Sequence, residues 1–353
     1  MRFIAVLAVL SLPAPAALGA QSAHVFALPY VGSAPETGVQ VGATAFRVTQ
    51  PADTTNRPST AQVFASYTAK HQARAFIETD RWSRGNVWHA VAHLELARTP
   101  LFYYGFGDRA PASAEEAYTP RGTLGSLLVQ RQLRGPLYLE GGYQFQDMRI
   151  ASDSNGALRT DAVRGARGGR VGQLQGGALW DSRDDVFAPY RGSYVEATGS
   201  LSAAATGSDF AFRRLVVDAR HFVPLGGRRI LALQVAGELT GGDAPFDLVS
   251  LVGSSNYLRG YATGRFRDQD LLSAQAEYRA HLWRRIGCAA FAGAGTIAPR
   301  VGGLLASGAR VLPSYGAGVR WQLFTSSRSA IRVDYARGTA GSSGLYLSLN
   351  EAF

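Results

Sequence analysis

The sequence predicts an all-β protein, a transmembrane antiparallel β-barrel of about 16 strands. Three observations support this prediction. Apolar and polar residues alternate with a period of two in many segments, which is typical of strands with one apolar face. These segments are about 10–13 residues long, as tilted strands that cross a membrane must be. Short and long connections alternate along the chain, as they do in bacterial outer-membrane barrels.

The alternation is clearest in residues 271–283. Even-numbered positions carry the apolar residues Leu272, Ala274, Ala276, Tyr278, Ala280 and Leu282. Odd-numbered positions carry Ser273, Gln275, Glu277, Arg279 and His281. The same division recurs in 194–201, 230–240, 314–323 and 330–336. We therefore expect strands whose apolar side chains meet lipid while their polar side chains face a lumen.

A soluble β-sandwich shows the same alternation with its apolar face turned inward, and a secreted all-β protein is the alternative. Connection lengths favour the membrane barrel. The short ones are 133–135 and 224–228, and the long ones are 99–117, 150–169 and 241–270. Aromatic residues also fall near predicted strand ends, where interfacial girdles form; they are Trp283, Trp321, Phe324 and Phe353.

Fifteen strands are predicted from the alternation. They cover 37–49, 60–69, 71–82, 86–98, 118–132, 136–149, 170–182, 192–203, 210–222, 228–240, 271–283, 286–297, 313–324, 329–338 and 344–353. A short first strand near 25–31 makes sixteen, because an even number is expected when both chain ends lie in the periplasm. We expect residues 21–353 to form one outer-membrane barrel domain.

The N-terminal segment and the composition indicate an exported protein. Residues 1–20 resemble a cleaved secretory signal peptide, with Arg2, a short apolar stretch and then small residues. The single cysteine, Cys288, excludes an internal disulfide. The net charge is +10, but the basic residues are dispersed and all are arginine except Lys70, which argues against nucleic-acid binding. We expect these arginines to face a polar lumen or anionic lipid headgroups.

A series of motifs runs through the chain in a fixed order. It comprises Tyr103–Gly107, Asp181–Asp185 with Pro189 and Gly192, Leu258–Tyr261, Glu277–Arg279, Gly316–Trp321, Ile331–Ala336 and the terminal Phe353. This series resembles the barrel of the BamA/TamA outer-membrane assembly-factor superfamily, also called the bacterial surface antigen family. The resemblance implies a long loop that folds into the lumen, in a family that inserts or translocates proteins.

The sequence departs from the family pattern at three points. Gly293 stands where the family usually has the carboxylate of a Phe-x-Asp-x-Gly motif, and Asn350 stands where glycine is common. We also expect the chain to lack the periplasmic POTRA domains that receive client proteins, because the sequence beside the predicted barrel leaves no room for them.

The long loop supplies the first candidate site, the motif Arg259, Gly260 and Tyr261. The resemblance implies that Arg259 presses against the inner wall, where a confined guanidinium requires carboxylate partners. With a glycine at position 293, Glu277 is the first predicted partner and Asp334 the second. The residues expected to complete an alternating charge network are Arg279, Arg320 and Arg332. The alternative is that all of these are ordinary solvated lumen charges.

The last strand supplies the second candidate site. Its apolar face is expected to carry Leu345, Leu347, Leu349 and Phe353, with Glu351 as the exception. The resemblance implies that such a strand with a terminal aromatic residue is read by the cell's barrel assembly machinery. In the family, the seam between the first and last strands can open and pair with an incoming strand.

No catalytic, metal or cofactor site is predicted, and we do not expect an enzyme. His89 and His93 share one face of a strand but lack a third ligand. The chain has no Gly-x-Ser-x-Gly elbow and no nucleotide-binding glycine fingerprint. A serine–histidine pair in the barrel wall, as in a barrel phospholipase, is the alternative from the enzyme class.

Two functions are consistent with these features. The first is insertion or translocation of proteins, or of lipids, at the bacterial outer membrane. The second is that of a passive structural barrel or small-solute pore. The expected partners are outer-membrane lipids including lipopolysaccharide, the barrel assembly machinery, and unfolded outer-membrane proteins or a separate periplasmic partner. Nucleic acid is not among them.

Overall fold

The computed structural model describes residues 10–12, 22–34, 38–53, 55–69, 71–152, 156–160, 162–254, 258–323, 328–339 and 341–353. The chain forms two compact units. Unit one comprises Met1–Phe102, Glu116–Gly176 and Ser200–Ala211, and unit two comprises Tyr103–Glu115, Gly177–Gly199 and Phe212–Phe353. Among the described residues, no helix has the length and apolar character needed to span a membrane.

Unit one is an antiparallel meander in which sequential long strands pair. Its strands are β1 (Leu10–Leu12), β2 (Ser22–Ala34), β3 (Gly38–Gln50), β4 (Ser59–Thr68), β5 (Ala73–Trp82), β6 (Trp88–Arg98), β8 (Glu116–Arg134) and β9 (Leu137–Ser152). The short β7 (Leu101–Tyr103) is bypassed, since β6 pairs with β8. The short helices of this unit are η1 (Arg84–Asn86) and η3 (Ala204–Thr206). β1 pairs with β2 and lies inside the predicted signal peptide, most of which is outside the described residues.

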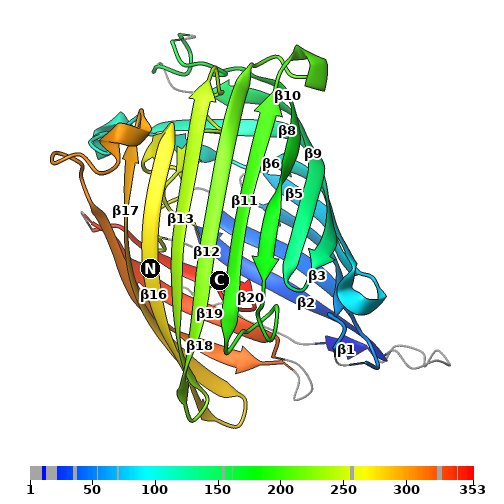
Figure 1. Ribbon diagram of the computed structural model, residues 1–353. Coiled ribbons are helices and arrows are strands. Elements are labelled where there is room, and N and C mark those ends of the chain that lie inside the picture. Colours follow the sequence, from blue (N-terminus) through cyan, green and yellow to red (C-terminus); the bar gives the residue numbers. More distant parts are fainter. Residues whose placement is uncertain are drawn as a thin grey trace. The chain divides into compact units, whose positions relative to one another are not determined.

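Unit two continues the same antiparallel pattern (Figure 1). Its strands are β12 (Phe212–Gly226), β13 (Arg229–Gly242), β16 (Asp270–Trp283), β17 (Ile286–Ala298), β18 (Leu312–Gln322), β19 (Ala330–Arg337) and β20 (Ser343–Leu349), each paired with the next. β10 (Gly168–Asp181) and β11 (Gly192–Ser202) have residues in both units. The short helices are η2 (Ala112–Ala114) and η4 (Val301–Gly303).

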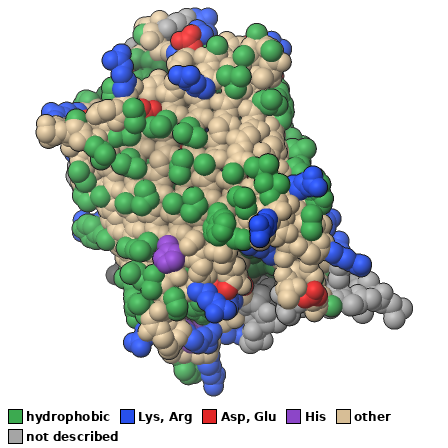
Figure 2. All heavy atoms as spheres, in the orientation of Figure 1, with side chains coloured by type: hydrophobic (Ala, Val, Ile, Leu, Met, Phe, Trp, Pro, Cys, Tyr) green, Lys and Arg blue, Asp and Glu red, His purple; other side chains and the backbone are tan. Residues whose placement is uncertain are grey.

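The sheet of unit two has one apolar and one polar face. The exposed apolar side chains include Leu215, Leu233, Val235, Tyr278, Val319, Val333, Tyr335, Leu345 and Leu347. The opposite face buries Gln234, Glu238, Ser273, Gln275, Glu277, Arg279, Ser314, Arg320, Arg332 and Asp334. Over β12, β13 and β16, Figure 2 shows hydrophobic side chains on the outer surface, with basic side chains near the strand ends. This arrangement, inverted relative to a soluble core, is the one that a lipid environment requires.

The predicted strands are present, with one correction at the C-terminus. The described strands of seven or more residues are β2–β6, β8–β13 and β16–β20, which confirms the predicted sixteen. The expectation that Phe353 continues the exposed alternation of the last strand is wrong. β20 ends at Leu349, Asn350 adopts a positive φ of 60°, and Phe353 is buried. The backbone turn at Asn350 takes the last residues off the strand.

Candidate functional site

The loop between β13 and β16 lies against the polar face of unit two. It contains the hairpin β14 (Ser250–Leu251) and β15 (Arg267–Asp268). Its apolar side chains pack with strand residues in one buried cluster of Val252, Leu258, Tyr261, Phe266, Leu271, Ile297 and Leu312. Because Leu271, Ile297 and Leu312 come from β16, β17 and β18, this cluster fixes the loop over three neighbouring strands.

The loop motif makes a tight turn that only glycine fits at its centre. Gly260 has a φ of 107°, and a Cβ atom there would lie 2.5 Å from the carbonyl carbon of Arg337. Its N–H donates a hydrogen bond to the Tyr346 hydroxyl at 2.8 Å. The Tyr261 hydroxyl donates to the carbonyl of Pro313 at 2.6 Å. The turn is therefore held against β18, β19 and β20 by backbone and side-chain contacts.

Arg259 lies between two carboxylates at the centre of the site. Its Nη2 is 2.5 Å from Oε2 of Glu277, and its Nη1 is 2.5 Å from Oδ2 of Asp334. All three side chains are 0% exposed. The guanidinium also lies 3.4 Å from the ring centroid of Phe291, and the Ser314 hydroxyl donates to the Arg259 carbonyl. The structure thus brings both predicted partners onto the arginine at once.

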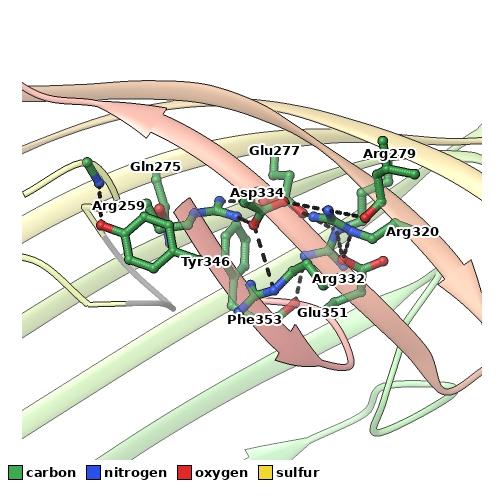
Figure 3. A network of polar contacts seen from close by, with 12 residues as sticks. Arg259, Gln275, Glu277, Arg279, Arg320, Arg332, Asp334, Tyr346, Glu351 and Phe353 are labelled. Carbon is green, nitrogen blue, oxygen red and sulfur yellow. Dashed lines mark hydrogen bonds and ion pairs between the residues drawn. The ribbon is translucent and has the colours of Figure 1, made fainter. Parts of the chain in front are cut away.

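The charges continue from Arg259 along the polar face, alternating in sign (Figure 3). Arg320 contacts Asp334 at 2.5 Å, Glu277 at 3.2 Å and Glu351 at 2.7 Å. Arg279 contacts Glu277 at 2.7 Å, and Arg332 lies 3.7 Å from Asp334. We call this set the charge network: Arg259, Glu277, Arg279, Arg320, Arg332, Asp334 and Glu351. Four guanidinium groups thus share three carboxylates.

Burial decides the energetics of this network. Removing an ion from water costs several kcal/mol, and only well-oriented partners offset that cost. Arg259 meets this condition because each of its terminal amines contacts a different carboxylate. Loss of the arginine would remove one contact from each carboxylate and leave Arg320 as the guanidinium that contacts both Glu277 and Asp334. The loop therefore supplies one of the four cations that surround the buried carboxylates.

Two glycines explain how the wall accommodates this arrangement. Gly318 faces Asp334 in the β18–β19 register, and a Cβ atom there would overlap the carboxylate. Gly293 stands where the family has its carboxylate, and a Cβ atom there would lie 2.7 Å from the Cβ of Gln275. The amide of Gln275 donates to the side-chain oxygen of Gln234 at 2.5 Å. Packing therefore leaves no space for a side chain at position 293, and Glu277 with Asp334 holds the arginine instead.

The C-terminal tail joins the charge network, which the sequence did not predict. Phe353 packs in a buried cluster with Phe222, Ile230, Ala232 and Ala352. Nη2 of Arg279 donates to the carbonyl of Phe353 at 2.8 Å. Glu351, expected to be an exception on an apolar face, instead ends on the polar side beside Arg320. Asn350 was the available signal, since asparagine tolerates a left-handed backbone.

The remaining residues of the last strand lie as expected where they are described. Leu345 and Leu347 are exposed on the apolar face. The side chain of Leu349 lies outside the described part of the structure. Leu345 and Leu347 are therefore available to lipid, while Phe353 is not.

Two further motifs of the family pattern also have defined contacts. The guanidinium of Arg267, in the long loop, lies 5.0 Å from the ring centroid of Tyr103. The backbone carbonyl of Arg267 accepts a hydrogen bond from the N–H of Gly107 at 2.8 Å. In the turn between β10 and β11, Asp184 contacts Arg328 at 2.8 Å. Burial raises the pKa of Asp184, but hydrogen bonds from Arg328 and from the N–H groups of Tyr190 and Arg191 outweigh it, so this pKa lies below its ordinary value.

The two histidines of unit one have carboxylate neighbours. His89 lies 2.9 Å from Oδ1 of Asp80 and 2.6 Å from the side-chain oxygen of Gln130. His93 lies 3.0 Å from Glu78 and 3.2 Å from Glu95. Each ring nitrogen thus faces a polar atom of the same strand or a neighbouring one.

An antiparallel sheet with an exposed apolar face and a buried polar face is the construction of an outer-membrane β-barrel. A family model described as the Omp85 superfamily domain matches residues 56–353, and the chain belongs to the Omp85 superfamily. Omp85 barrels are outer-membrane proteins, so this chain is one as well. The comparison with curated proteins found no match.

Solved structures with the same fold include two bacterial proteins. One is BamA from Haemophilus ducreyi lacking POTRA domains 1–3, with a TM-score of 0.58 and 14% identity, over 94% of this chain and 70% of that one. The other is CdiB from Acinetobacter baumannii, with a TM-score of 0.58 and 11% identity, over 99% of this chain and 65% of that one. At these identities the likeness shows the fold alone, and it confirms the predicted barrel. The family match confirms the predicted resemblance to the superfamily.

Proposed function

We propose that this protein acts in the insertion or translocation of proteins, or of lipids, at the outer membrane. Membership in the Omp85 superfamily and the folds shared with BamA and CdiB support this proposal. The observation that carries it is the loop fastened to the polar face by Arg259, Glu277 and Asp334. A purely structural wall has no need for a loop whose release would take one cation away from two buried carboxylates.

The loop acts as a strap across several strands of unit two. Glu277 belongs to β16, Ser314 to β18 and Asp334 to β19, and all three contact Arg259. Because Arg259 contacts all three strands, its release would remove a side-chain contact from each at once, while the backbone pairing of the strands remains. In this proposal, the strap determines how readily the wall of unit two rearranges for a client.

The proposal extends to partners and maturation. The exposed apolar face would contact outer-membrane lipids, including lipopolysaccharide. The barrel assembly machinery would read the last strand when it inserts this protein, and residues 1–20 would be removed on export. The clients would be unfolded outer-membrane proteins, presented directly or by a separate periplasmic partner. No chemical reaction is part of this function.

Assisted folding tests the proposal. The protein is reconstituted in liposomes, an unfolded outer-membrane barrel is added, and the insertion rate is followed beside empty liposomes. We expect acceleration by the wild-type protein and loss of that acceleration in Arg259→Ala. The matched control is Arg74→Ala, which removes a half-exposed arginine paired with Glu95 in unit one. It should accelerate insertion as the wild type does.

Two results would count against the proposal. A rate equal to that of empty liposomes would exclude stand-alone insertion, and single-channel conductance in the same liposomes would then identify the passive pore. Equal acceleration by the wild type and Arg259→Ala would show that the strap has no part in the activity. Resistance of each variant to unfolding on unheated gels confirms that it is folded.

A further inference from the structure

A cavity of about 80 Å³ in unit two is surrounded by basic side chains. It lies at the strand ends opposite the long loop, where the β12–β13 and β16–β17 turns are found. Its arginine, histidine and carboxylate lining residues are Arg228, Arg279, His281, Arg285, Arg320, Arg328 and Glu351. Within the described lining, five arginines and one histidine therefore surround a single carboxylate.

The positive charge of this cavity is only partly neutralised by its surroundings. Arg279 and Arg320 contact Glu277, Arg320 also contacts Asp334, and Arg328 contacts Asp184. Glu351 is shared between Arg320 at 2.7 Å and Arg279 at 3.6 Å. Among the described residues, Arg228 and Arg285 have no carboxylate within ion-pair distance. Nη1 of Arg279 is buried and, in the part of the chain that is described, has no hydrogen-bond partner. An anion in the cavity would supply the missing acceptors.

We propose that this cavity binds a phosphate group, as a phosphate monoester or diester. Arginine presents a planar fork of donors that matches phosphate oxygens, and here the arginines come from several separate segments. A tetrahedral group can accept from several directions at once, which a flat carboxylate does less well. The volume is several times the roughly 10–15 Å³ that a single water requires, so a phosphate group fits.

The position of the cavity brings it close to a lipid surface. Trp283 and Trp321 are each 61% exposed at the same strand ends, on the apolar face. Exposed tryptophans at strand ends mark the boundary between hydrocarbon and headgroups. The phosphate can therefore come from a phospholipid headgroup or from a soluble phosphate compound. A phospholipid has acyl chains that would add to its binding affinity, and a soluble compound has none.

Calorimetry on the full chain in an uncharged detergent tests this site. The probes are inorganic phosphate and a short-chain phosphatidylglycerol. The variants are Arg228→Asn and Arg285→Gln, and the matched control is Arg284→Asn. Arg284 has a positive φ in a turn, as Arg228 does, but it stacks on Trp283 at 4.5 Å and does not line the cavity. Loss of a charged hydrogen bond should weaken binding by about tenfold in each cavity variant.

The outcomes separate the possibilities. The control should bind as the wild type does, and Glu351→Gln should bind more tightly because a like charge has been removed. Tighter binding of phosphatidylglycerol than of phosphate identifies a lipid headgroup, and the reverse order identifies a soluble compound. Absence of binding to the wild type, or an equal loss in Arg284→Asn and the cavity variants, would overturn the proposal.

Discussion

Each unit carries a polar network on one face of its sheet, but the two networks differ in how they are built. In unit one, Arg74 and Glu95 pair at 2.6 Å from the adjacent strands β5 and β6, and the Arg74 side chain is 45% exposed. His93 of β6 extends this pair to Glu78. In unit two, Arg259 comes from a loop, and its side chain is completely buried between Glu277 and Asp334.

The difference shows when a row of polar residues contributes strongly to stability. Neighbouring strands bring opposite charges together through register alone, and water still screens such pairs. Burial requires a cover, and in unit two the loop and the C-terminal tail provide it. The same arginine–carboxylate chemistry therefore contributes little in unit one and is decisive in unit two.

The largest expected effects come from substitutions of Arg259. Arg259→Leu takes one cation from the buried Glu277 and Asp334. The free energy of unfolding should fall by about 3 kcal/mol, the lower end for a broken buried pair, because Arg320 still contacts both carboxylates. Urea unfolding of the refolded protein in micelles measures it. Arg74→Leu in unit one should change the free energy of unfolding by about 1 kcal/mol, because the Arg74 side chain is 45% exposed and water screens its pair with Glu95. Equal effects in the two variants would break the comparison between the units.

Charge reversal sharpens the same point. Arg259→Glu should destabilise the protein at least as much as the leucine variant, because it adds a third carboxylate to the site. A second substitution, Glu277→Arg, should restore part of the stability by returning a cation to that position. If heat-modifiability on gels shows no rescue, Arg259 and Glu277 do not act as a pair.

Phe353→Ala tests the cover that the tail provides. A buried phenylalanine contributes about 3 kcal/mol or more, and we expect the lower value because a chain end can detach. Leu305→Ala is the control, since Leu305 is 81% exposed beside η4 and should have little effect. Urea unfolding compares the two. A loss no larger than that of Leu305→Ala would mean that the tail is not a cover of the network.

The strands were predictable because their pattern is local. Residues such as Leu272 and Glu277 alternate with a period of two, and the lipid environment fixes which face is apolar. The candidate partners of Arg259 were predictable for the same reason, since alternation places Glu277 and Asp334 on the polar face. The motif resemblance singled out Arg259 and implied that its loop folds into the lumen against the inner wall.

The burial of the C-terminal tail was not predictable from the local pattern. Neither was the simultaneous contact of Glu277 and Asp334 with Arg259. Phe353 leaves the apolar face because Asn350 turns the backbone and because Phe222 and Ile230, more than a hundred residues away, form its cluster. Likewise, Asp334 reaches Arg259 only where Gly318 leaves space. These are contacts of tertiary packing, and a period of two contains no information about them.

Gly260→Ala tests the turn that aims Arg259. The variant combines a positive φ with a Cβ atom placed against the backbone of Arg337, so we expect a loss of about 1–3 kcal/mol. Gly341→Ala is the matched control, because Gly341 also has a positive φ but nothing within 4 Å of its Cβ position. The difference between the urea midpoints of the two variants reports the cost of placing a Cβ atom at position 260 against the backbone of Arg337. Equal midpoints would show that the loop backbone can move away at no cost.

The smallest effect extends the comparison to a turn of each unit. In unit two, Arg328 and backbone N–H groups lower the pKa of Asp184 although burial alone would raise it. In unit one, hydrogen bonds from Thr55 lower the pKa of the exposed Asp53. A carboxyl whose pKa is lowered on folding stabilises the protein above its ordinary pKa near 4, and this contribution disappears as the pH falls below that value. Asp184→Asn should therefore reduce the loss of thermal stability between pH 5 and pH 3, and Asp53→Asn should reduce it less, because water competes for its hydrogen bonds. Thermal unfolding at several pH values measures how much stability each variant loses between pH 5 and pH 3. A larger reduction of that loss in Asp53→Asn than in Asp184→Asn would contradict the rule that burial, more than pairing itself, determines what a charge contributes to stability here.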